Sequence, residues 1–200
     1  MMRITAQLNG MGKGGLFLSL FGGVWMLFAL DASSWIWLVT CVLLPTSLLA
    51  MRSVGLLLAG RQAQALEPPP AGDELAWERR RSRRFAAVVL VEFGLIALAA
   101  NLLAHSGHAD WIMVAVAAIV AAHFMPLARI FHYPLYYWLG GIELAACAAV
   151  AFSLRAHLAA GDVLLGLVMA LSLWSAAVIG LLRANRLVAG VRAAAAAKSA

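Results

Sequence analysis

Charged residues are scarce in this chain. Only 12% of its 200 residues are Asp, Glu, Lys or Arg, whereas 64% are hydrophobic. A soluble domain carries about 25% charged residues, and a water-soluble fold of this size has too little interior to hide so much apolar surface. The shortage of charge therefore excludes an ordinary soluble domain and makes the lipid bilayer the natural solvent.

Cysteine is also scarce, and the familiar chemical motifs are missing. Cys41 and Cys147 lie inside apolar runs and form no Cys-x-x-Cys pair, so we expect two small buried residues and no disulfide. We find none of the motifs of nucleotide-binding proteins, kinases or hydrolases. No cofactor is expected, and the sequence leaves enzymatic activity open while favouring a protein that is not an enzyme.

Long apolar runs are abundant. They are rich in Ala and Leu and do not alternate with a period of two, so they predict helices and not the strands of a barrel. The expected fold is all-α, a polytopic membrane bundle of six transmembrane helices in a single membrane domain over residues 1–200. At roughly 20 residues per span, the six spans cover about residues 14–30, 34–58, 85–103, 111–130, 135–153 and 163–182.

The basic residues predict the orientation of these spans. Every one of the 15 Lys and Arg residues except Arg155 lies on the side that holds both termini and the loops after the second and fourth spans. Basic residues mark the cytoplasmic side of a membrane. Both termini are therefore predicted to be cytoplasmic, and the chain is predicted to lie in the inner (plasma) membrane. This distribution also accounts for the net charge of +6 without a nucleic-acid partner.

The longest predicted cytoplasmic loop covers residues 61–84. Its Pro68, Pro69 and Pro70 favour an extended segment, after which Asp73 can begin a short helix. Anionic lipid is the expected partner of the basic cluster that follows, because the cluster lies where the topology needs an anchor. A docking site for another macromolecule is the less favoured alternative. The cluster consists of Arg79, Arg80, Arg81, Arg83 and Arg84.

Two carboxyl groups and one imidazole lie within the predicted spans: those of Glu92, Glu143 and His123. At about 1.5 Å per residue, each lies roughly 10–12 Å inside the predicted cytoplasmic boundary. Their spans are consecutive, so they are expected to be neighbours in space. Ionisable groups are costly in hydrocarbon and commonly mark a function. We therefore expect one ligand- or proton-binding cluster facing the interior of the bundle.

Three roles are possible for this cluster. Two nearby carboxyl groups share a proton more easily than they both stay charged, and an imidazole can relay it. The same three residues could hold a divalent metal, although their spacing matches no known metal motif. They could also fix helix packing by hydrogen bonds alone. Three such residues at one depth favour the proton-coupled site.

Neighbouring residues extend the candidate site. Pro126 lacks a backbone donor and so frees the carbonyl of Ala122 beside His123. Arg129, at the end of the fourth span, could neutralise an anionic ligand or pair with a carboxylate. Tyr136 lies on the same helix face as Glu143.

Part of the chain resembles small bacterial multi-pass membrane proteins of an uncharacterised family. The resemblance covers the third to fifth spans, including Glu92 and Trp111. It rests on His123-Phe124-Met125-Pro126-Leu127-Ala128-Arg129, followed by Pro134-Leu135-Tyr136-Tyr137 and Gly140. That family has no assigned activity, so the resemblance implies a bacterial membrane protein and supplies no chemistry.

The predicted function is that of an integral inner-membrane protein that binds or translocates a small solute or ion, with proton coupling at the Glu/His site. The first alternative is a non-catalytic assembly subunit or sensor. The second is an intramembrane metal-dependent enzyme. The sequence leaves the ligand and the oligomeric state open.

Overall fold

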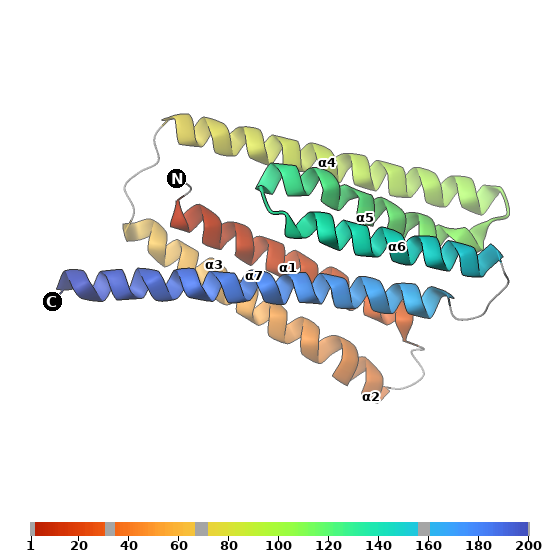
Figure 1. Cartoon of the computed structure of the whole chain (residues 1–200), viewed down its shortest axis with the longest axis horizontal. Helices are drawn as coiled ribbons and strands as arrows, with labels where there is room; N and C mark the ends of the chain where they lie inside the picture. Colours follow the sequence, from red (N-terminus) through yellow and green to blue (C-terminus); the bar gives the residue numbers. More distant parts are fainter. Residues whose placement is uncertain (1–2, 31–34, 67–71, 156–160, 200) are drawn as a thin grey trace. The chain divides into compact units, whose positions relative to one another are not determined.

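The computed structural model describes residues 3–30, 35–66, 72–155 and 161–199, and every regular element in these ranges is a helix (Figure 1). Six helical segments are long and apolar enough to cross a membrane. They cover Ile4–Ala29, Leu38–Gln64, Gly72–His105, Ala109–Phe131, Leu135–Leu154 and Val163–Gly190. The predicted all-α fold with six spans is confirmed at this level, and the cytoplasmic placement of the termini stays a prediction.

The helices extend beyond the apolar runs that predicted them. α3 continues to Leu66 and α4 begins at Gly72, so the predicted loop 61–84 is helical on both sides of residues 67–71, and the three prolines lie outside the described residues. Hydropathy marks only the apolar part of a helix, whereas Ala, Arg, Gln and Glu continue it readily. The elements are α1 (Ile4–Ala29), α2 (Trp35–Trp37), the π-helix η1 (Leu38–Leu43), α3 (Leu44–Leu66), α4 (Gly72–His105), the 3₁₀ turn η2 (Ala109–Trp111), α5 (Ile112–Phe131), α6 (Leu135–Arg155) and α7 (Gly161–Ser199).

The chain forms two compact units. One, which we call the terminal unit, consists of Met1–Pro69 and Leu173–Ala200, and the other, the central unit, is Pro70–Ser172. The boundary falls within α7, whose first turns belong to the central unit and whose remainder belongs to the terminal unit. The single membrane domain stays a prediction.

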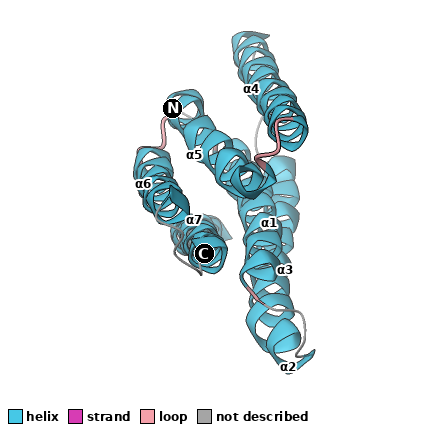
Figure 2. Cartoon of the chain, turned by 90° about the vertical axis from the view of Figure 1, so that its right-hand side faces the viewer, coloured by secondary structure: helices cyan, strands magenta, loops and turns pink. Residues whose placement is uncertain are grey.

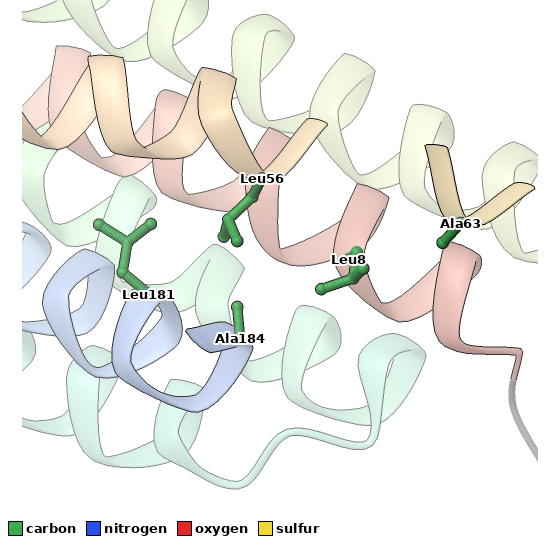
Figure 3. Packing of buried hydrophobic residues seen from close by; sticks show 5 residues of the cluster. All are labelled: Leu8, Leu56, Ala63, Leu181 and Ala184. Carbon is green, nitrogen blue, oxygen red and sulfur yellow. The ribbon is translucent and has the colours of Figure 1, made fainter. Parts of the chain in front are cut away.

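In the terminal unit, α1 packs along α3, and α7 joins them through a small apolar cluster (Figure 3). The cluster consists of Leu8, Leu56, Ala63, Leu181 and Ala184. Further along α1, the indole Nε1 of Trp174 donates a hydrogen bond of 3.1 Å to the carbonyl of Ser19. Gly22 makes room for this indole, since a Cβ there would come within 2.5 Å of its ring. Small residues and buried polar contacts of this kind hold helices together where lipid removes the hydrophobic driving force.

The π-helix η1 ends at Leu43, two residues before Pro45. In a regular α-helix, the proline ring would clash with the carbonyl of Cys41, four residues earlier. A π-turn is wider than an α-turn and moves that carbonyl away. The Thr40 hydroxyl donates a hydrogen bond of 2.7 Å to the carbonyl of Ile36 on the same helical stretch. Pro45 accounts for the geometry of this region.

In the central unit, α5 lies between α4 and α6 (Figure 2). A tight turn joins α5 to α6. His132 adopts a left-handed conformation with φ of 51°, and the amide of Tyr133 donates to the carbonyl of Ala128 at 3.1 Å. Such a left-handed cap ends a helix, and Pro134 prevents its continuation. The turn returns the chain so that Gly140 of α6 meets α5.

Candidate functional site

The central feature of the site is a contact between Glu92 of α4 and His123 of α5. The Nδ1 atom of His123 lies 3.3 Å from Oε1 of Glu92, and both side chains are buried. Among the residues of α4, all of which the structure describes, Glu92 alone is buried. This apolar helix therefore turns its one acidic residue of the span toward α5, because pointing it at lipid would cost far more.

The hydrogen bonds of His123 indicate which ring nitrogen carries the proton. Its Nδ1 lies 3.3 Å from the carbonyl oxygen of Val120 as well as 3.3 Å from Glu92. A carbonyl oxygen only accepts hydrogen bonds, so Nδ1 is assigned as the N–H donor. In a neutral imidazole, Nε2 is then left as an acceptor. The pair thus combines a carboxyl group with an imidazole nitrogen that can take up a proton.

The pair lines a groove of about 540 Å³ between α4 and α5. Pro126 lies in the wall of this groove beside Ala122. Because proline has no N–H, the carbonyl of Ala122 lacks its usual helical donor. The groove therefore offers a carboxyl group, an imidazole and a freed carbonyl among apolar walls. Its lining residues are Ala87, Val88, Val91, Glu92, Leu95, Ala118, Ile119, Ala122, His123 and Pro126.

Glu143 of α6 has a different set of neighbours. The hydroxyl of Ser172, in the part of α7 that belongs to the central unit, donates to Oε1 of Glu143 at 2.7 Å. Glu143 is 0% exposed, and its Oε2 atom has no hydrogen-bond partner among the described residues. Cys147, one helical turn further along α6, is also buried. Ser172 thus holds one oxygen of this carboxyl group, and the other faces apolar surroundings.

The three residues predicted to form one cluster are therefore found as a pair and a separate carboxyl group. Within the described ranges, no group of three or more His, Cys, Asp or Glu side chains could hold a metal ion. Matched depth along the helices correctly predicted that Glu92 and His123 are partners. The neighbours of Glu143, however, also depend on how α6 is rotated about its own axis. A Cβ on Gly140 would lie 2.6 Å from the carbonyl oxygen of Ala121, so Gly140 seats α6 on α5. In that rotation, Glu143 meets Ser172 of α7.

The remaining predicted residues lie toward the ends of α5 and α6. Arg129 is exposed in the last turn of α5. The ring of Tyr136 packs at 5.7 Å from Phe124 and at 5.3 Å from Tyr133, measured between centroids. Tyr136 is therefore part of an aromatic cluster between α5 and α6, and Phe124 connects this cluster to His123 at 5.0 Å.

The basic cluster on α4 divides into two kinds of residue. The guanidinium carbon of Arg81 lies 5.2 Å from the ring centroid of Trp77 and 4.9 Å from that of Phe131. Guanidinium groups are attracted to aromatic faces at this distance, so Arg81 joins α4 to the end of α5. The other members are exposed and remain accessible to a partner: Arg79, Arg80, Arg83 and Arg84.

Sequence reasoning missed Ser172 and Phe131. Ser172 was predictable by the depth argument used for the ionisable residues, since it lies near the middle of the sixth span and could have been matched to Glu143. Phe131 gave no such signal, because an aromatic residue at the end of a span is expected at any membrane interface.

The fold and this site define a multi-pass helical protein of the membrane with a buried acid–imidazole pair. No family model matches the chain, and no curated protein or solved structure is significantly similar to it. The resemblance to bacterial multi-pass proteins therefore stays a prediction, and the geometry alone supports the proposals that follow.

Proposed function

We propose that the chain binds or translocates a small solute, with proton coupling at Glu92 and His123. The observation that carries the proposal is the pair itself: the one buried side chain of α4 is a carboxyl group, and it meets an imidazole at 3.3 Å in the wall of an apolar groove. A pair that served packing alone would need no groove beside it.

In this proposal, Glu92 and His123 exchange a proton as acid and base. A ligand that hydrogen-bonds to Glu92 weakens the contact of this carboxyl group with Nδ1 of His123 and so changes where a shared proton is most stable. His123 can take up a further proton at Nε2, and the imidazolium that forms can give its Nδ1 proton to Glu92, which returns the ring to its neutral form. Binding in the groove and protonation of the pair are then linked, and each changes the equilibrium of the other.

Glu143, Arg129 and Tyr136 have other parts in this proposal. Glu143 is held by Ser172 and acts as a separate buried carboxyl group. Tyr136 supports His123 through Phe124. Arg129 is exposed in the last turn of α5, so an anionic ligand would meet it at that end of the helix.

The proposal places the protein in the inner membrane of a bacterial cell with both termini in the cytoplasm. Support comes from the positions of the Lys and Arg residues, since all except Arg155 fall on one side of a six-span arrangement. The exposed members of the basic cluster lie next to the apolar stretch of α4 and suit the headgroups of anionic lipid: Arg79, Arg80, Arg83 and Arg84. Each such residue near anionic lipid contributes about 1 kcal/mol.

Infrared difference spectroscopy on the purified protein in liposomes tests the proposal. A pH jump should change the carboxyl absorption of Glu92 in the native protein, and Glu92→Gln should remove that change. His123→Gln should shift the pH at which it occurs. Glu74→Gln is the matched control, since Glu74 is exposed on the same helix. Proton uptake by the same liposomes under an imposed gradient should fall in the first two variants.

The alternative role in assembly gives a different result. If Glu92 and His123 only hold α4 to α5, Glu92→Gln and His123→Gln lower the unfolding temperature and leave both the infrared change and proton uptake as in the native protein. That outcome would remove proton coupling from the proposal.

A further inference from the structure

We propose that the solute of this site is lipid-soluble: an apolar chain with a single hydroxyl head, which enters the groove between α4 and α5 from the bilayer. The inference rests on the proposed function, because it names the class of ligand for the same site. Three observations support it: the apolar lining of the groove, the polar groups around Glu92 and His123, and the exposure of α4.

The walls of the groove match an apolar chain. Eight of the ten lining residues are Ala, Val, Leu, Ile or Pro, and only Glu92 and His123 are polar. The volume of about 540 Å³ lies within the range of small-molecule sites. A hydrated ion or a sugar would leave most of its hydrogen bonds unmade against such walls, at a cost of several kcal/mol by transfer measurements. An alkyl or prenyl chain makes no such demand.

The polar groups match a single hydroxyl head. The carbonyl of Ala122 lacks its helical donor because of Pro126, and His123 presents Nε2 as an acceptor. Both therefore accept a hydrogen bond and offer none. Glu92 can complete the contact with a third acceptor or, when protonated, with a donor. A hydroxyl group donates one hydrogen bond and accepts others, which suits this set better than a ketone or ester, whose oxygens only accept.

Access to the groove is lateral. Val91 is 60% exposed and Leu95 is 47% exposed, and both line the groove in the middle of the apolar stretch of α4. Only 6% of that stretch is buried, against 44% for Ala109–Phe131. At this depth an exposed side chain meets hydrocarbon, so a molecule dissolved in the bilayer reaches the groove without crossing water.

Photolabelling in lipid nanodiscs tests the inference. The probe is a long-chain primary alcohol with a diazirine in its chain, and the labelled peptides are identified by mass spectrometry. In the native protein we expect label on α4 and α5. The same chain without its hydroxyl should label these peptides about threefold to tenfold less, which is the value of one lost hydrogen bond.

Two pairs of variants give the test its specificity. Ala122→Trp fills the groove and should reduce labelling by the alcohol about tenfold, whereas Ala145→Trp, at an exposed position of α6 outside the groove, should leave it unchanged. Replacing both Glu92 and His123 with Leu exchanges the pair for apolar groups, which helices tolerate better than loss of one partner. In that double variant, only the carbonyl of Ala122 is left to accept from the hydroxyl, so the preference for the alcohol over the hydroxyl-free chain should be smaller than in the native protein.

Three results would overturn the inference: equal labelling by the two probes in the native protein, labelling outside α4 and α5, or labelling that Ala122→Trp does not reduce. Absence of any label because a second copy of the chain covers the groove would overturn it too, and cross-linking between copies would identify that case. The infrared experiment keeps the two proposals apart. Labelling without a Glu92 protonation change removes proton coupling alone, and a protonation change without labelling removes the lipid-soluble ligand alone.

Discussion

At the scale of single residues, the polar side chains inside the membrane region differ in how completely they are satisfied. The Nδ1 proton of His123 has two acceptors within 3.3 Å and can serve either one, whereas Glu143 has one hydrogen bond on Oε1 and none on Oε2 among the described residues. The hydroxyl of Ser172 also lies 3.0 Å from the carbonyl of Met169, and one proton serves only one of these acceptors at a time. The contact between Ser172 and Glu143 is therefore expected to be worth little more than an ordinary hydrogen bond.

Substitutions of Glu143 should separate its hydrogen bond from its charge. In Glu143→Gln, the amide oxygen still accepts from Ser172 and the volume is kept, so we expect the free energy of unfolding to change by less than about 1 kcal/mol. Glu143→Ala leaves a cavity in a fully buried position and should cost about 2–4 kcal/mol. Thermal unfolding in detergent measures both. Equal destabilisation by Gln and Ala would mean that the negative charge of Glu143 stabilises the fold.

Arg81 offers a second test at this scale. Its guanidinium group contacts the faces of Trp77 and Phe131, and the ammonium of Lys does not stack in this way. Arg81→Lys should therefore destabilise the central unit by about 1 kcal/mol. Arg80→Lys, at the exposed neighbouring position, is the matched control and should change stability by less than about 0.5 kcal/mol. If both variants unfold at the same temperature, the stacking contributes nothing measurable.

At the scale of helices, the contact between α5 and α6 depends on Gly140. A methyl group there would lie 2.6 Å from the carbonyl oxygen of Ala121, which is backbone and can move only if the helices separate. We expect Gly140→Ala to cost about 1–3 kcal/mol. Gly141 is the control on the same helix, because nothing lies within 4 Å of an added Cβ. Gly141→Ala should leave stability unchanged or raise it by up to about 1 kcal/mol through helix propensity.

Thermal unfolding of the two glycine variants, followed by circular dichroism, measures this difference. A Gly140→Ala protein as stable as Gly141→Ala would show that α5 and α6 tolerate a wider separation. Labelling of the groove should be kept in both variants, since Gly140 and Gly141 lie outside its lining.

The same contact explains how far the site could be predicted. Apolar runs identified every span, and matched depth identified Glu92 and His123 as partners, because α4 and α5 are consecutive antiparallel helices. Depth says nothing about rotation about the helix axis, and so Glu143 was assigned to the same cluster, whereas its carboxyl group is bonded to Ser172 of α7. The end of α3 was underestimated, since residues 61–66 are mostly polar but favour helix, and the short helix predicted from Asp73 is continuous with the third span. The groove depends on side-chain shapes along two helices and left no pattern in the sequence.

At the scale of the whole molecule, the basic residues and the apolar helices together predict an orientation in the membrane. Exposed Leu, Val and Phe side chains cover the helices, with Leu90, Phe93 and Leu102 on α4 among the most exposed. Exposing such a large apolar surface to water would be unfavourable, whereas contact with the hydrocarbon of a bilayer is not. The Lys and Arg residues then predict which end of each helix faces the cytoplasm.

Reporter fusions test this orientation. Gly107 lies in the turn between α4 and η2, has a φ of 76°, and is exposed, so it accepts an insertion. An extracytoplasmic reporter enzyme inserted there should be active, a cytoplasmic one should be inactive, and tags on both termini should report cytoplasm.

A second variant tests the basic cluster. The fraction of inverted molecules should increase when four residues are changed together to Gln, since each basic residue near anionic lipid contributes about 1 kcal/mol. The four are Arg79, Arg80, Arg83 and Arg84. Arg81 is kept in this variant because it stacks on Trp77 and Phe131. Cytoplasmic activity of the Gly107 reporter in the native chain would contradict the six-span arrangement, and unchanged orientation in the neutral variant would mean that other residues set it.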